Sequence, residues 1–173
     1  YIRGGQMHPN GKWLIYGANV DPDSGTEIEP TIIYRHDITA DKRTVLARPQ
    51  KGGYIVPRLS PTGTHILYNR KDLHPSGLQL WLVDIDGQQD REIMNVGADK
   101  KVLAHWFPDG QRILLRAETD THYKIGVYEL GTGSVRWLID DPDRNFENAF
   151  IPCGSVQAVL QEVREAGIHA SLL

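Results

Sequence analysis

Short apolar runs alternate with turn-forming residues along most of this chain. In Leu78–Asp84 the leucines at alternate positions lie on one face of an extended segment, and Gln79, Trp81 and Val83 lie on the other. This two-residue period predicts β-strands. One segment, Gln157–Ala166, also fits a helix, but its valines and its place in the pattern favour a strand. The chain is therefore predicted to be all-β.

The same criterion predicts strands throughout the sequence. A long insertion, Asn19–Pro30, is expected to be a loop between the first two of these strands. The predicted strands are Lys12–Ala18, Thr31–Asp37, Arg43–Leu46, Tyr54–Arg58, His65–Arg70, Leu78–Asp84, Arg91–Met94, Lys101–Trp106, Arg112–Ala117, Lys124–Leu130, Val135–Ile139, Glu147–Ile151, Val156–Glu165 and Ile168–Leu173.

A turn phrase, x-Pro-x-Gly followed by an apolar run, occurs four times: in His8–Tyr16, Ser60–Tyr68, Phe107–Leu115 and Ile151–Val159. Proline presets φ in such a turn, and glycine accepts a positive φ. The spacing between the glycines, 44 to 52 residues, is typical of repeats in which each unit buries its face on a neighbour.

Four short strands per repeat, with turns at even spacing, predict the blades of a β-propeller. The fold class expected is an all-β propeller segment of four-stranded antiparallel blades, with three blades and an incomplete fourth. The blades are predicted to span about 1–48, 52–96, 100–141 and 146–173, the last being incomplete.

Composition excludes some classes of partner. The net charge of −3 and the scattered Lys and Arg residues give no basic surface for nucleic acid. No apolar run is long enough to span a membrane. A single cysteine, Cys153, rules out an internal disulfide and leaves the compartment open.

Two phrases resemble a known class of repeat. Trp106–Leu114 is similar to the strand-turn-strand signature of TolB-type propeller repeats, and Leu80–Gly87 resembles their third strand and following turn. Such repeats form the TolB propeller and the N-terminal propeller of prolyl-oligopeptidase-family serine peptidases, which include acylaminoacyl and dipeptidyl peptidases. The rhythm of Gly126–Leu138 and the insertion Asn19–Pro30 favour the peptidase family.

In that family catalysis belongs to an α/β-hydrolase domain whose nucleophile lies in Gly-x-Ser-x-Gly. This sequence contains no such motif and no alternating β–α pattern. The resemblance therefore implies a non-catalytic propeller that gates substrate access and docks to a catalytic domain, in a cytoplasmic protein. The alternative is a TolB-like protein-interaction propeller in the periplasm, and a remote one is a metal-dependent, sugar-active propeller enzyme.

Four residues are candidates for binding. Glu27 and Glu29 lie in the insertion, and a carboxylate pair suits the free amino terminus of a peptide substrate. His36 and His105 are the first candidates for a metal in the propeller channel, although no histidine spacing matches a metal motif. Loop charge and ordinary strand histidines explain these residues more simply, so no metal and no cofactor is expected.

The incomplete fourth repeat predicts a partner. Propellers avoid exposed edges by closing a ring, and three blades with part of a fourth cannot close in the usual way. Both terminal blades are then expected to present apolar side faces, and Ile168–Leu173 an unpaired edge. We expect contact with the rest of a longer polypeptide or with a second copy.

Overall fold

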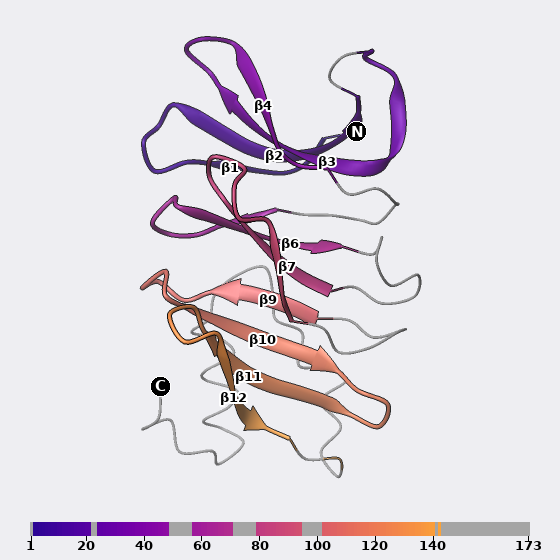
Figure 1. The fold of residues 1–173 in the computed structure, drawn as a ribbon, viewed down its shortest axis with the longest axis vertical. Helices are drawn as coiled ribbons and strands as arrows, with labels where there is room; N and C mark the ends of the chain where they lie inside the picture. Colours follow the sequence, from indigo (N-terminus) through magenta and orange to yellow (C-terminus); the bar gives the residue numbers. More distant parts are fainter. Residues whose placement is uncertain are drawn as a thin grey trace. The chain divides into compact units, whose positions relative to one another are not determined.

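In a computed structural model of the protein, the described residues form three four-stranded antiparallel sheets in which strand order follows chain order (Figure 1). The chain divides into two compact units, residues 1–102 and 103–173. No helix in the described part of the chain is long and apolar enough to cross a membrane. The residues whose structure is described are 2–21, 24–48, 57–70, 79–94, 102–140 and 142.

Each sheet is one blade, and its four strands follow one another along the chain. The first blade consists of β1 (Ile2–Met7), β2 (Trp13–Val20), β3 (Glu27–Asp37) and β4 (Lys42–Ala47). The second consists of β5 (Arg58–Leu59), β6 (His65–Arg70), β7 (Gln79–Asp84) and β8 (Arg91–Met94). The third consists of β9 (Val102–Trp106), β10 (Arg112–Glu118), β11 (Tyr123–Glu129) and β12 (Ser134–Ile139).

The x-Pro-x-Gly phrase forms the same turn in all three described blades. In the first blade the His8 N–H donates to the Trp13 carbonyl (2.8 Å), and the Gly11 N–H donates to the His8 carbonyl (2.9 Å). The second and third blades repeat both bonds. Since the turn glycine has φ between 66° and 75° in each case, a conformation that costs an L-residue energy, glycine is required here: Gly11, Gly63 and Gly110.

A side-chain oxygen completes each turn, but its position in the phrase differs. Asn10 in the first blade and Asp109 in the third use Oδ1 to accept from two backbone N–H groups at the start of the next strand. In the second blade Ser60 Oγ does this, accepting from the N–H groups of Thr64 and His65 at 3.1 Å. The repeats thus keep the bonds while changing the residue that makes them.

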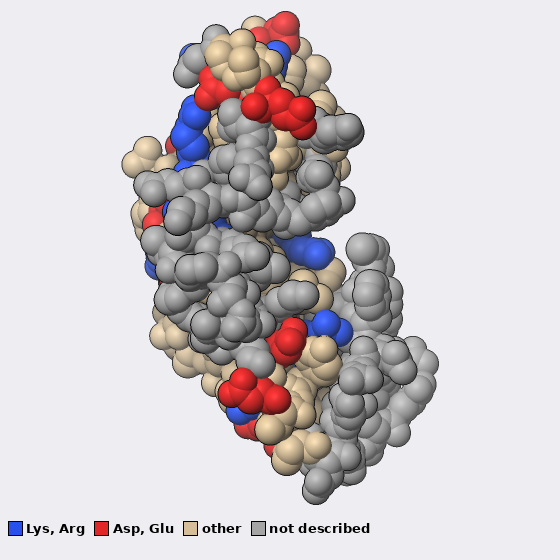
Figure 2. Space-filling view, turned by 90° about the vertical axis from the view of Figure 1, so that its right-hand side faces the viewer, with Lys and Arg blue, Asp and Glu red and all other residues tan. Residues whose placement is uncertain are grey.

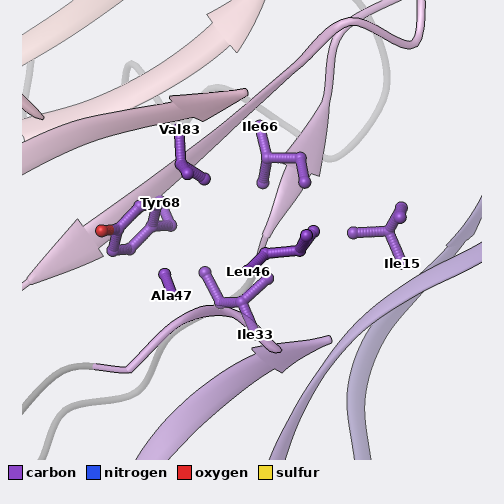
Figure 3. Close-up of a cluster of buried hydrophobic side chains, with 7 residues drawn as sticks. All are labelled: Ile15, Ile33, Leu46, Ala47, Ile66, Tyr68 and Val83. Atoms are coloured by element: carbon purple, nitrogen blue, oxygen red, sulfur yellow. The ribbon is translucent and has the colours of Figure 1, made fainter. Parts of the chain in front are cut away.

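One apolar core lies between the first and second blades (Figure 3). Ile15 and Ile33 from the first blade pack with Ile66 and Val83 from the second, and each of these four side chains is fully buried. Tyr68 closes the same cluster with its ring. This interdigitation of two sheet faces fixes how the two blades meet.

The opposite face of the first blade is also apolar. Register pairs Tyr16 with Tyr34 and Ala18 with Ile32, so these four side chains share the face that points away from the second blade. The Tyr16 and Tyr34 rings stack at 5.5 Å, and both side chains are at least 95% buried. The expectation of an exposed apolar side face is therefore wrong for the described part of this blade.

The structure corrects the strand assignment in two places and covers a third only in part. The sequence analysis did not predict β1, which pairs with β2 through a bulge at Gly4 and Gly5. Half of the predicted loop Asn19–Pro30 is strand: β2 continues to Val20, and β3 begins at Glu27. In the second blade the described first strand is β5, at Arg58–Leu59. Tyr54–Val56 and the predicted fourth repeat lie outside the described residues.

Candidate functional site

The predicted carboxylate pair falls on one strand. Glu27 begins β3, is exposed, and lies opposite Val20 in the hairpin register. Glu29 belongs to the same strand, but its side chain lies outside the described part of the structure. Binding of a peptide amino terminus by these residues stays a prediction.

The two candidate metal ligands lie in different units. His36, on β3, places Nε2 2.8 Å from Asp41 Oδ1 at the rim of the first blade. His105 is half-buried on β9. Among the described residues, no group of three or more His, Cys, Asp or Glu side chains is placed to hold a metal ion. A metal role for these histidines stays untested.

Polar bonds join the first two blades at the turn rim. Arg35 donates to the Ile85 carbonyl and to Asp86 Oδ1, both at 2.7 Å, and stacks on the Trp13 ring at 4.4 Å. His8 accepts from the Asn10 N–H at Nδ1, so its Nε2 carries the proton and donates to the Gly63 carbonyl at 2.9 Å. The contact between the two blades therefore continues from the apolar core of Figure 3 to the turn rim through polar bonds.

The second blade holds a further buried polar group on the same face. The Tyr68 hydroxyl donates to Asp90, which also pairs with Arg70 at 3.2 Å. Arg70 stacks on the Trp81 ring at 4.1 Å. Burial, and then the bond to Asp90, raise the pKa of Tyr68 well above its usual range, so this hydroxyl stays protonated. It serves as a donor within the core.

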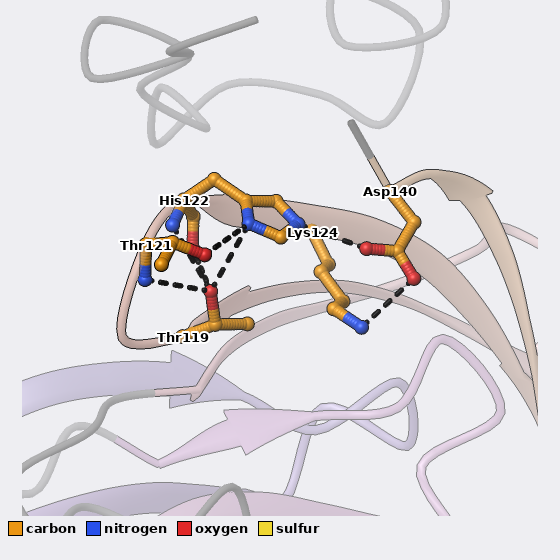
Figure 4. A network of polar contacts seen from close by, with 5 residues as sticks. All are labelled: Thr119, Thr121, His122, Lys124 and Asp140. Carbon is orange, nitrogen blue, oxygen red and sulfur yellow. Dashed lines mark hydrogen bonds and ion pairs between the residues drawn. The ribbon is translucent and has the colours of Figure 1, made fainter. Parts of the chain in front are cut away.

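The group that most resembles a catalytic centre lies in the third blade, where the β10–β11 hairpin meets the end of β12 (Figure 4). Asp140 accepts from His122 Nε2 and from Lys124 Nζ, both at 2.8 Å. On the other side of the ring, His122 Nδ1 lies 2.8 Å from Thr121 Oγ1 and 3.4 Å from Thr119 Oγ1. Bonds from Lys124 and His122 lower the pKa of Asp140, which keeps this carboxylate charged.

These bonds connect Asp140, His122 and Thr121 in the sequence acid–histidine–hydroxyl that a catalytic triad has. With its proton on Nε2, His122 offers Nδ1 as an acceptor to the Thr121 hydroxyl, as a general base does toward a nucleophile. Acyl transfer also needs donors for the developing oxyanion. Here the N–H groups of Thr121 and His122 both point to Thr119 Oγ1, at 3.4 and 3.0 Å, and are therefore already used.

Two parallels in the other unit favour a structural role. Thr64 Oγ1 contacts Nδ1 of its neighbour His65 at 2.9 Å, so this contact arises locally wherever Thr precedes His in this geometry. In the first blade, Arg48 just after β4 pairs with Asp21 of the β2–β3 hairpin at 3.1 Å. Asp140, just after β12, makes the equivalent link to His122 of the β10–β11 hairpin, with the carboxylate now at the strand end. We therefore interpret the Figure 4 group as a clamp between hairpin and strand end.

The sequence analysis did not single out these groups. Arg35 and Asp86 are 51 residues apart, and Tyr68 and Asp90 are 22 apart, so no local spacing marks them. The only trace of these groups in the sequence is that a charged residue recurs at the ends of strands. This recurrence predicts where strands end, but it does not predict which charged residues pair with one another.

Solved structures of β-propeller proteins resemble this chain. A TolB protein from Agrobacterium tumefaciens aligns with TM-score 0.56 at 23% identity, over 81% of this chain and 49% of that one. The β-propeller domain of the trilobed protease from Pyrococcus furiosus aligns with TM-score 0.58 at 14% identity, over 78% and 41%. The chain is a β-propeller segment.

A peptidase propeller matches in the same way. A puromycin-hydrolysing peptidase from Mycobacterium tuberculosis aligns with TM-score 0.55 at 17% identity, over 81% of this chain and 23% of that one. No protein-family profile and no curated protein matches the chain. The propeller segment thus spans under half the length of each of these solved structures, and at these identities the likeness concerns the fold.

Proposed function

We propose that this chain is the non-catalytic propeller portion of a prolyl-oligopeptidase-type serine hydrolase. In this role it docks to a catalytic α/β-hydrolase domain and gates the access of peptide substrates. Its partner is the rest of a longer polypeptide, and Glu27 and Glu29 are the candidates for holding a substrate's amino terminus.

One observation carries this proposal. Propellers of several peptidases align with the chain, among them a puromycin hydrolase at TM-score 0.61, while the sequence itself has no Gly-x-Ser-x-Gly motif. Beside the Asp–His–Thr group of the third blade, the N–H groups of Thr121 and His122 are already bonded to Thr119 Oγ1. Chemistry supplied by another domain, with this chain controlling access, agrees with both facts.

The experiment uses the product of the whole gene beside the chain of residues 1–173. A fluorophosphonate probe, which labels activated serines, is expected to label the full product and to leave this chain unlabelled. If the full product is also unlabelled, the peptidase proposal fails. For gating, kcat/KM of the full product is compared for a dipeptide ester and a protein substrate. A full product that cleaves both equally well has no gate.

The second candidate is a TolB-like interaction propeller. It is favoured by the sequence identity of 23% to the Agrobacterium tumefaciens structure, which exceeds the 17% to the puromycin-hydrolysing peptidase. The discriminating observation is the reading frame beyond Leu173. A stop after the last blade, with a secretion signal upstream, favours the interaction module, and Gly-x-Ser-x-Gly downstream favours the peptidase.

A further inference from the structure

The turn of the first blade contains the only Asn-Gly pair in the sequence, Asn10 followed by Gly11. Both residues are exposed, and a Cβ added at Gly11 would meet nothing within 4 Å. An asparagine side chain before glycine is open to attack by the next backbone nitrogen, because glycine has no side chain to crowd that nitrogen and leaves the backbone free to turn. This pair is therefore placed for a reaction of the chain with itself.

The reaction replaces the side-chain amide by a carboxylate. The Gly11 nitrogen loses its proton and attacks Asn10 Cγ; the bond from Cγ to Nδ2 breaks, and the departing NH2 group takes up a proton and leaves as ammonia. Water then opens the cyclic imide that remains. If water breaks the new bond between Cγ and the Gly11 nitrogen, the product is aspartate. If it breaks the original peptide bond, the main chain runs through the former side chain, and the product is isoaspartate.

The hydrogen bonds of the turn favour the attack. Negative charge develops on Asn10 Oδ1 during this step, and that oxygen already accepts from the N–H groups of Lys12 at 2.9 Å and Trp13 at 3.3 Å. Donors fixed at an oxygen that becomes negative lower the barrier to such an addition. Nδ2, the leaving nitrogen, has no hydrogen-bond partner among the described residues. The Gly11 N–H has to give up its bond to the His8 carbonyl, at 2.9 Å.

The third blade shows that aspartate fits the same turn. Asp109 occupies the position of Asn10, and its Oδ1 accepts from the N–H groups of Gln111 at 2.8 Å and Arg112 at 3.1 Å. Burial alone would raise the pKa of Asp109, but these bonds and the Arg112 side chain lower it, so the carboxylate stays charged. In the first blade the turn is exposed, and charges of both signs already lie side by side over this blade in the upper part of Figure 2.

We propose that Asn10 is a site of spontaneous deamidation, and that the first blade keeps its structure when the product is aspartate. Aspartate retains the oxygen that caps the turn. Isoaspartate makes the main chain one atom longer, so the bonds of the turn cannot all form again. The bond from His8, in the same turn, to the Gly63 carbonyl of the second blade is then expected to weaken. The inference does not depend on the peptidase proposal.

The first test follows the reaction in the folded chain at mildly alkaline pH. Trypsin releases residues 4–12, and mass spectrometry is expected to find this fragment one mass unit heavier after incubation. Gly11→Ala should slow the conversion by about tenfold, because a Cβ crowds the attacking nitrogen. Asp109-Gly110 is the internal control and should form no isoaspartate in the same time, since a charged carboxylate resists attack. The proposal is overturned if the fragment from the folded chain stays unchanged while a synthetic peptide of residues 4–12 converts.

The second test asks whether aspartate fits the turn. Asn10→Asp should unfold at the same urea concentration as the unchanged chain, whereas Asn10→Ala, which lacks the capping oxygen, should unfold at a lower one. The isoaspartate form, separated from aged protein by chromatography, should also unfold at a lower concentration. An Asn10→Asp variant that is weakened as much as Asn10→Ala contradicts the proposal, and so does an isoaspartate form as stable as the unchanged chain.

Discussion

The turn glycine of the second blade gives the sharpest test of how the first two blades are joined. A Cβ added at Gly63 would lie 2.4 Å from Nε2 of His8, which no side chain tolerates without movement. The same residue has φ +75°, which costs an L-residue about 1–2 kcal/mol. Gly63→Ala therefore combines backbone strain with the displacement of the His8 ring.

Gly11 separates these two contributions. It occupies the same position in the first blade's turn with φ +70°, but an added Cβ there meets nothing within 4 Å. Because alanine also restricts the unfolded chain by about 0.4–1 kcal/mol, Gly11→Ala should cost about 1 kcal/mol. Gly63→Ala should cost about 2 kcal/mol more, from overpacking and from the lost bond between His8 and the Gly63 carbonyl.

The assay is equilibrium unfolding in urea followed by tryptophan fluorescence, with free energies compared at a common slope. A double-mutant cycle repeats the measurement in a His8→Ala variant. Because the His8 ring is then absent, Gly63→Ala should cost no more than Gly11→Ala. If the two glycine variants differ by less than about 0.5 kcal/mol in the original background, the His8 contact does not join the blades as described.

Three other predictions concern single blades. Gly126→Ala places a Cβ 2.6 Å from the tryptophan across the strand pair and should cost about 1–3 kcal/mol in urea unfolding, whereas Gly131→Ala, in open space, should be nearly neutral. Burial lowers the pKa of His65 below 6.5, so the unfolded state binds more protons and stability should fall as pH drops through that value, a slope that replacing His65 by Gln should reduce. Ser60→Ala should cost about 1–2 kcal/mol, and adding Thr62→Asp should recover most of it by placing the acceptor where the other turns have it.

The repeat itself could be predicted from the sequence because its determinants are local. Pro-x-Gly sets the turn, and the alternation of apolar residues sets the strands. Eleven of the twelve described strands therefore overlap a predicted strand. The exception, Ile2–Met7, contains two adjacent glycines and no alternation. It becomes a strand through pairing with β2, a tertiary effect that no short window of sequence contains.

The insertion Asn19–Pro30 is expected to be a loop because the other repeats have no equivalent segment. A proline inside a strand argues against pairing, and Pro30 lies within β3. The structure accommodates it because the register with β2 passes from Ile32 directly to Glu27, so Pro30 falls in the unpaired part of the bend. A proline thus indicates where the ladder is interrupted, and here it marks the bend of the β2–β3 hairpin.

The candidate site was harder to predict because polar residues in a repeat protein serve the architecture first. Asn10, Ser60 and Asp109 differ in chemistry and in their place in the phrase, yet all three close the same turn. His122 lies in a group that resembles a catalytic centre, yet its hydrogen bonds are those of a clamp. Residues explained by the repeat carry little information about function.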